Sequence, residues 1–161
     1  MNFIIREMVE EDIKQVQDVA KESWNSTYEG IISREIQENF LSLAYNNGML
    51  EKRLETTLFF VAELENDIVG FANFSPIVRE GEVELSAIYI YPDQQGKGIG
   101  TALLQECIKN LENIKEIYVD VEKENEVGKT FYEAKGLKIV EEFDDNFDGH
   151  ILKTVRMVLK V

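Results

Sequence analysis

The sequence predicts an α/β fold in which a mixed, mostly antiparallel sheet of about seven strands is combined with about four helices. Apolar residues recur at helical spacing over 10–24 and 98–111, whereas the period is that of strands over 58–91. A strand–helix–strand unit runs from Glu84 to Val121. Because such crossovers are right-handed, its two strands are expected to be parallel. The length of 161 residues fits one domain spanning 1–161.

Turn signals divide the rest of the chain. Glu65-Asn66-Asp67 separates two strand-like runs, and the acidic stretch 144–149 is expected as a second hairpin turn. Residues 25–30 are expected as a polar turn, and 49–56 fit neither period clearly. In chain order we expect strands over 2–7, 58–64, 68–77, 82–91, 116–121, 137–143 and 151–159, and helices over 10–24, 33–43, 98–111 and 125–135.

The composition limits the classes of function. The formal net charge is −14, from 17 Lys and Arg against 31 Asp and Glu. This argues against a nucleic-acid partner, because phosphate contacts need basic side chains, and it is compatible with a cationic substrate such as a polyamine. No apolar run approaches the ~20 residues of a membrane helix, and the N-terminus does not read as a signal peptide. We therefore expect a cytoplasmic protein with no membrane partner.

The single cysteine and the single histidine do not indicate a catalytic pair. Cys107 lies on the apolar repeat of the helix expected over 98–111, and His150 is far from it in the sequence. A catalytic thiol needs a nearby base, so Cys107 is expected to be a buried core residue. His150 is expected to be a hairpin residue, and no metal site is predicted.

The strongest functional signal is a glycine-rich turn between the strand expected over 82–91 and the following helix. Pro92 ends the strand, and glycines follow at alternate positions as Gly96, Gly98 and Gly100. Such a turn leaves backbone N–H groups free at a helix N-terminus, which favours phosphate. The P-loop pattern is absent. The dinucleotide fingerprint would need a parallel fold, whereas the strands before this turn form a meander.

Two motifs resemble those of the GNAT N-acetyltransferase superfamily, in its single-domain bacterial form. The first is Gln95-x-x-Gly98-x-Gly100, which resembles the family's acetyl-coenzyme A signature. The second is Asn125 followed by Phe131-Tyr132 and Gly136-Leu137, which resembles the family's other motif. Leu137 stands where phenylalanine is commoner. The order of the elements is similar as well, so the resemblance covers essentially the whole chain. It implies a GNAT-like sheet whose parallel pair of strands splays around acetyl-coenzyme A.

The resemblance implies most of the cofactor site. The backbone of 88–90 would pair with the pantetheine arm as an added strand does, and Asn125 would bond the same arm, cap a helix, or do both. Tyr132 would donate a proton to the coenzyme A sulfur, the alternative being that it only packs beside Phe131. The residues implied to bind acetyl-coenzyme A are Ile88, Tyr89, Ile90, Gln95, Gly96, Lys97, Gly98, Ile99, Gly100, Thr101, Asn125 and Tyr132.

The acceptor side is predicted from fewer signals. By resemblance to members with a glutamate at about this place, Glu84 is the expected catalytic base. Glu82 is expected on the same strand face as Glu84. The two carboxylates would then attract a cationic amine; the alternative is that both are solvated strand residues. Trp24, Tyr28 and Glu29 form an aromatic and acidic cluster that suits a cationic amine, or else anchors a loop.

These expectations lead to one leading hypothesis and two alternatives. The leading hypothesis is an enzyme that transfers acetyl from acetyl-coenzyme A to a primary amine of a small molecule, a polyamine being one candidate. The alternatives are a peptide or protein N-terminal acetyltransferase and a non-catalytic acyl-coenzyme A sensor. The sequence does not name the acceptor, and a homodimer is compatible with the resemblance because related proteins often dimerise.

Overall fold

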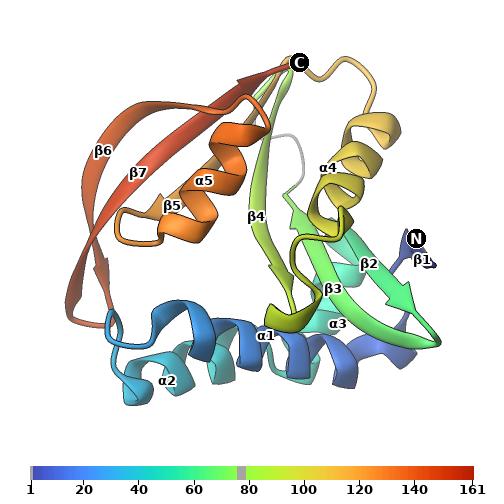
Figure 1. The fold of residues 1–161 in the computed structure, drawn as a ribbon, viewed down its shortest axis with the longest axis horizontal. Coiled ribbons are helices and arrows are strands. Elements are labelled where there is room, and N and C mark those ends of the chain that lie inside the picture. The colour runs from blue at the N-terminus through green and yellow to red at the C-terminus, as the bar shows by residue number, and fades with distance from the viewer. Residues whose placement is uncertain (1, 76–78) are drawn as a thin grey trace.

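The protein is organised around one seven-stranded sheet. The structure is a computed structural model that describes residues 2–75 and 79–161. The strand order is β1-β2-β3-β4-β5-β7-β6, and neighbouring strands are antiparallel except for β4 and β5, which are parallel (Figure 1). The predicted fold class is therefore confirmed. The strands are β1 Phe3–Glu7, β2 Leu58–Leu64, β3 Asp67–Phe74, β4 Glu82–Ile90, β5 Glu116–Glu122, β6 Lys138–Phe147 and β7 His150–Lys160.

Helices cover both faces of the sheet. Within the described residues there are five α-helices: α1 Ile13–Tyr28, α2 Arg34–Ala44, α3 Asn47–Thr56, α4 Ile99–Asn110 and α5 Glu126–Ala134. Helix α1 packs on one face, where Val16 and Val19 meet Phe71. Helix α4 packs on the other, where Leu103 and Cys107 join a separate core cluster. We refer to these two sides of the sheet as the α1 face and the α4 face.

The alternation of side chains along the strands explains this two-layer core. In β2, Phe59 and Val61 belong to the cluster on the α1 face, whereas Phe60 and Ala62 belong to the cluster on the α4 face. All four are at most 4% exposed. Such strands, apolar on both faces, are typical of a sheet covered by helices on each side. Cys107 is fully buried as predicted, and burial raises the pKa of its thiol to about 12.

Strands β4 and β5 separate soon after they pair. Their parallel register includes only Glu82 with Glu116, Val83 with Ile117, and Glu84 with Tyr118. Beyond Glu84 the two strands diverge (Figure 1). A register shift in the pairing of β3 with β4 skips Ser86, and this bulge accompanies the change in direction of β4. The remainder of β4, from Ser86 to Ile90, is thus without a neighbouring strand on its β5 side.

Two turns lie elsewhere than the sequence predicts. Residues 25–28, expected in a polar turn, continue α1, where Trp24 and Tyr28 pack one helical turn apart with tilted rings whose centroids are 4.5 Å apart. The acidic stretch is mostly strand: β6 runs to Phe147, and the hairpin turns at Asp148 and Gly149 with φ of 50° and 80°. Two left-handed residues in sequence are typical of a tight two-residue hairpin.

The remaining differences are small. The ambiguous segment 49–56 belongs to α3, whose first turn is capped by Asn46 accepting from Met49 N–H at 2.9 Å. The strand expected over 68–77 ends at Phe74, and its positions 76–78 lie outside the described residues. Among the helices at 2–75 and 79–161, none combines the length and apolar character required to cross a membrane.

Phe71 is a core position where loss of packing should be costly. It is fully buried and its ring lies 5.4 Å from Phe59, 5.7 Å from Tyr89 and 5.9 Å from Tyr45. We expect Phe71→Ala to lower the free energy of unfolding by ~3–5 kcal/mol, through lost burial and the cavity left behind. Urea denaturation measures this. Leu43→Ala, at a side chain 74% exposed, is the control and should change little; equal losses in both variants would contradict the core assignment.

Candidate active site

The glycine-rich turn ends in a helix N-terminus with free donors. Gly96 and Gly98 have φ of 80° and 85°, a conformation that favours glycine, and a Cβ on either would meet no atom within 4 Å. The hydrogen bonds of α4 begin with Ala102 N–H to the Gly98 carbonyl, so the N–H groups of residues 99–101 have no helical partner. Partial positive charge therefore gathers beside an open turn.

Gly100 has a different structural role from Gly96 and Gly98. A Cβ at this position would lie 2.9 Å from the Phe131 ring and 3.3 Å from Ile90. Glycine here lets α4 and α5 approach each other above β4. The close approach fixes the glycine-rich turn relative to α5, which carries Tyr132.

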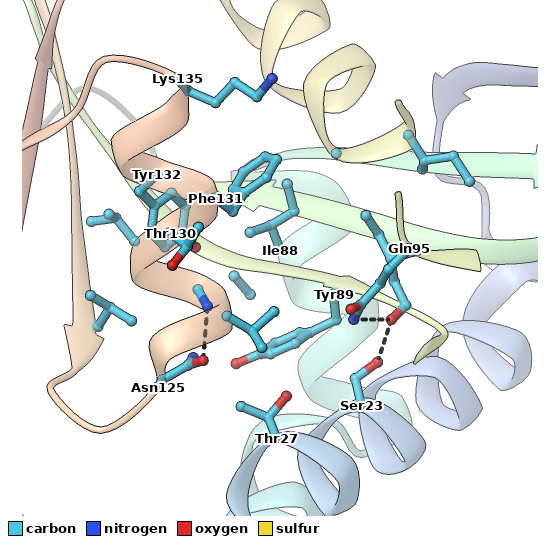
Figure 2. Close-up of a pocket in the computed structure, with 18 of the residues that line it drawn as sticks. Ser23, Thr27, Ile88, Tyr89, Gln95, Asn125, Thr130, Phe131, Tyr132 and Lys135 are labelled. Carbon is cyan, nitrogen blue, oxygen red and sulfur yellow. Dashed lines mark hydrogen bonds between the residues drawn. The ribbon is translucent and has the colours of Figure 1, made fainter. Parts of the chain in front are cut away.

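A cavity of about 560 Å³ lies between this turn, the open edge of β4, α5 and the end of α1 (Figure 2). It is lined from the α4 face by Ile88, Ile90 and Phe131, and from the α1 face by Tyr28 and Asp120. The separation of β4 from β5 thus joins the two faces of the sheet in one cavity. All of the predicted cofactor-binding residues except Lys97 line it; Lys97 is exposed and donates to Gln94 Oε1 at 2.9 Å.

The open edge of β4 offers main-chain groups to an extended ligand. Tyr91 N–H bonds the Val69 carbonyl of β3, so alternation turns the main-chain groups of Ile88 and Ile90 toward the cavity. The Ile90 carbonyl already accepts from Ser23 Oγ at 3.3 Å and from Gln95 Nε2 at 3.4 Å, as Figure 2 shows. The donors and acceptors that remain on this edge are arranged as those of a strand awaiting a neighbour.

Tyr132 lies in the wall of the cavity on α5 and is 7% exposed. No hydrogen bond of its hydroxyl is found among the described residues. Burial, and then the nearby Tyr28, raises the pKa of Tyr132 well above its usual value of 10. Tyr132 is therefore a neutral phenol that can donate a proton to an atom in the cavity.

Tyr28 reaches the cavity from the end of α1 and is held firmly. Its carbonyl accepts the N–H groups of Ile31 and Ile32, both at 3.0 Å, and Nε2 of the fully buried Gln37 at 3.4 Å. Burial, followed by the negative charge of Glu122, raises the pKa of Tyr28 to about 12. Tyr28 is thus a second neutral phenol at the point where the α1 face meets the cavity.

Asn125 caps α5 as predicted. Its Oδ1 accepts from Gly128 N–H at 2.9 Å, and a Cβ on Gly128 would lie only 2.7 Å from its Nδ2. The cap therefore requires glycine at 128. Because the same side chain also lines the cavity, capping fixes the amide where it can meet a ligand (Figure 2).

The two glutamates of β4 lie on the α1 face, outside the cavity wall. Val83 and Leu85 belong to the core on the α4 face, so Glu82 and Glu84 point the other way, as their spacing predicts. Glu84 is half-buried and accepts from Ser86 Oγ at 3.5 Å. Burial and the nearby Asp120 raise the pKa of Glu84, and Arg156 opposes them.

The structure does not bring the three residues of the predicted acceptor cluster together at the cavity. Trp24 is 5% exposed and packs against Phe40 at 4.3 Å and Phe147 at 5.9 Å, so it joins α1 to the β6–β7 hairpin. Glu29 is exposed and forms an ion pair with Arg34 at 3.1 Å. Only Tyr28 of the three reaches the cavity.

Sequence reasoning missed several lining residues with polar side chains, namely Ser23, Thr27, Ser86, Gln94, Asp120, Thr130 and Lys135. The available signal for Asp120 was its position: Ile117, Val119 and Val121 face the α4 core, so the polar residues between them face the other way. His150 is the first residue of β7 and lines a separate hollow of about 640 Å³ beside Glu122. Across 2–75 and 79–161, no three metal-binding side chains gather.

Free N–H groups at a helix N-terminus, an open strand edge and a protonated phenol fit a ligand that carries phosphates, an extended amide arm and a thioester. These are the parts of an acyl-coenzyme A, and the class of protein is a coenzyme A-dependent acyltransferase. The model of the acetyltransferase (GNAT) family matches residues 13–137. The chain belongs to this family, and it is an acetyltransferase whose donor is acetyl-coenzyme A.

Individual relatives are similar over nearly the whole chain. The spermidine N(1)-acetyltransferase of Thermoplasma acidophilum is 31% identical over 147 residues, which cover 86% of this chain and 90% of that protein. The uncharacterized N-acetyltransferase YuaI of Bacillus subtilis is also 31% identical, over 89% of this chain and 84% of its own. The crystal structure of PaiA N-acetyltransferase from Thermoplasma acidophilum in complex with coenzyme A has a TM-score of 0.89, with 30% identity and full coverage of both chains.

The glycine-rich turn gives a direct test of the phosphate assignment. In Gly98→Asp, a carboxylate would stand where the free N–H groups of α4 gather, and repulsion should weaken coenzyme A binding by about 10- to 100-fold, or ~1.4–2.8 kcal/mol. Isothermal titration calorimetry measures this. Gly149→Asp is the matched control, because Gly149 also has φ of 80° and open space but lies at a hairpin tip. Unchanged affinity of Gly98→Asp would remove the turn from the phosphate site.

Proposed function

We propose that this acetyltransferase acts on a primary amine of a small molecule, a polyamine being the leading candidate. The observation that carries the proposal is the cavity through the sheet, which lets an acceptor on the α1 face reach a thioester held on the α4 face. Carboxylates on the α1 face, among them Glu84 and Asp120, and a net charge of −14 favour a cationic acceptor. The similar spermidine N(1)-acetyltransferase adds support to this substrate class.

We assign the chemical roles as follows. Acetyl-coenzyme A supplies the thioester carbonyl, and a main-chain N–H on the open edge of β4 offsets the negative charge that develops on its oxygen. The C–N bond forms as the C–S bond breaks. Glu84 takes a proton from the amine, directly or through water, and Tyr132 gives its phenol proton to the departing sulfur. Solvent exchange returns the proton from Glu84 to Tyr132, so both residues end as they began.

The remaining predicted residues support binding in this scheme. Asn125 and the backbone of 88–90 would hold the pantetheine arm, and Tyr28 would contact the acceptor at the cavity. Trp24 would act through packing of the α1 end, and Glu82 and Glu29 would add negative charge around the approach of the amine. An acetyl-coenzyme A-dependent enzyme acting on small amines is consistent with a cytoplasmic location.

The acceptor class is tested with a panel of amines. Coenzyme A release is measured with spermidine, spermine, a diamine, a monoamine and an N-terminal peptide, at saturating acetyl-coenzyme A. We expect turnover with the polyamines and little with the peptide. Turnover only with the peptide would replace the proposed acceptor class, and thiol release no greater than background with every amine would leave a non-catalytic acyl-coenzyme A sensor as the better description.

Tyr132 should matter for turnover rather than for cofactor affinity. Tyr132→Phe keeps the ring that packs beside Phe131 but removes the only proton that the side chain can donate. We expect kcat to fall by about 10²–10⁴-fold, the usual contribution of a positioned acid, while the Kd for coenzyme A changes little. Phe131→Leu is the packing control. A normal kcat in Tyr132→Phe would limit this tyrosine to a structural role.

Glu84 should shape the acid limb of the pH–rate profile. The base must be deprotonated to act, so the rate of the native enzyme falls as pH drops through the raised pKa of Glu84. Glu84→Gln removes the base, so its rate should fall furthest below that of the native enzyme between the pKa of Glu84 and the pKa of the amine, where native Glu84 is ionised and the amine is still protonated. Glu82→Gln is the control, because Glu82 lies two residues away on the same face of β4. Parallel profiles for native enzyme and Glu84→Gln would exclude Glu84 as the base.

A further inference from the structure

Three neighbouring strands place charged side chains together on the α1 face. Glu84 of β4 pairs with Tyr118 of β5, and Asp120, two residues further along β5, pairs with Arg156 of β7. Each strand directs alternate side chains to this face, because the intervening residues belong to the α4 core. The result is a row of two carboxylates and a guanidinium next to the point where β4 and β5 diverge.

The guanidinium of Arg156 is fixed in a way that lysine could not reproduce. Its Nε lies 2.8 Å from Asp120 Oδ1 and its NH2 group 3.0 Å from Oδ2, a two-pronged contact that sets the plane of the carboxylate. The same guanidinium lies over the Tyr118 ring at 4.8 Å and 5.8 Å from the centre of Phe143. Two aromatic contacts and two hydrogen bonds thus hold one charged group.

Asp120, unlike Glu84, lines the cavity. Its side chain is 29% exposed, so one side faces Arg156 while solvent and the cavity reach another. Ser86 also lines the cavity and donates to Glu84, which places Glu84 immediately behind this wall. An amine that approaches the thioester from the α1 face therefore meets Asp120 at the wall and Glu84 just beyond it.

We propose that the Arg156–Asp120 ion pair is a positioning unit of the acceptor site: Arg156 holds Asp120 at the wall of the cavity, and Asp120 orients the acceptor ammonium and sets the charge around Glu84. This inference rests on the proposed function, because it assumes an amine acceptor and Glu84 as the base. It divides the work between the two carboxylates. Asp120, held by Arg156, contacts the acceptor ammonium, and Glu84 exchanges protons.

The charges that face Glu84 predict the direction in which each variant should shift the pKa of Glu84. The described groups around it are Glu82 on its own strand, Tyr118 and Asp120 on β5, and Arg156 on β7, with Glu141 of β6 beyond Arg156. The negative Asp120 favours protonation of Glu84, and the positive Arg156 opposes it. Removing Asp120's charge should therefore lower the pKa of Glu84, and removing Arg156's charge should raise it.

Two readouts test this in the full-length enzyme. The first is the titration of the Glu84 side-chain carboxyl by carbon-13 NMR, which needs no substrate. The second is the acid limb of the kcat/KM profile with the amine that the native enzyme acetylates best. The variants are Asp120→Asn, Arg156→Gln and Arg156→Lys, and Lys14→Gln is the control because it removes a positive charge from an exposed ion pair on α1.

We expect opposite shifts from the two charge removals. Asp120→Asn should lower the midpoint of the Glu84 titration and of the acid limb by about 0.5–1 pH unit. Arg156→Gln should raise both midpoints by a similar amount. Arg156→Lys keeps the charge but loses the two-pronged contact, so the titration should stay near native while KM for the amine rises several-fold. Lys14→Gln should change neither. A general loss of folding cannot produce opposite shifts, so partial destabilisation would not imitate this pattern.

The failures of the two proposals are distinguishable. If the native enzyme acetylates no amine, the proposed acceptor class fails, whatever the NMR titration shows. If it acetylates an amine but the Glu84 titration and the acid limb stay in place in Asp120→Asn and Arg156→Gln, the ion pair is only a surface contact and the inference is overturned. Shifts in the same direction for both variants would overturn it as well.

Discussion

The separation of β4 from β5 beyond Glu84 is the constraint on which the rest of the site depends. Main-chain donors and acceptors on a strand edge need partners, and a sheet normally supplies them from the next strand. Here the parallel register stops at Glu84, so the edge from Ser86 to Ile90 meets a cavity instead. In the proposed function acetyl-coenzyme A would complete this edge, and the same opening would connect a donor on one face of the sheet with an acceptor on the other.

The neutral state of the tyrosines around this opening follows from their burial. Tyr28, Tyr89 and Tyr132 all have a raised pKa because desolvation disfavours a phenolate. Charge is instead kept on the α1 face, where Glu84, Asp120 and Arg156 remain in contact with solvent to different degrees. Neutral phenols therefore line the cavity itself, whereas Glu84 and Arg156 lie outside its wall and Asp120 stands at its edge on the α1 face.

The fold, and the set of residues that line the cavity beside the glycine-rich turn, were largely predictable because their signals are local. Glycines at alternate positions, a proline stop, and the caps Ser33 and Asn125 each act within a few residues. The acceptor side was less predictable because it depends on contacts between distant segments. Trp24 turns into the core only because Phe40 and Phe147 cover it, and Asp120 gains its place only when β7 brings Arg156 beside it. Neither partner is evident from the local sequence.

The hydrogen bonds accepted by the carbonyl oxygen of Ile90 affect the entropy lost when a ligand binds. It accepts hydrogen bonds both from Ser23 of α1 and from Gln95 of the glycine-rich turn. The turn is thereby tethered to the sheet and to the helix on its opposite face before any ligand arrives. Preorganisation of this kind lowers the conformational entropy lost on association, so more of the attraction between an anion and the backbone of the turn would remain as net affinity.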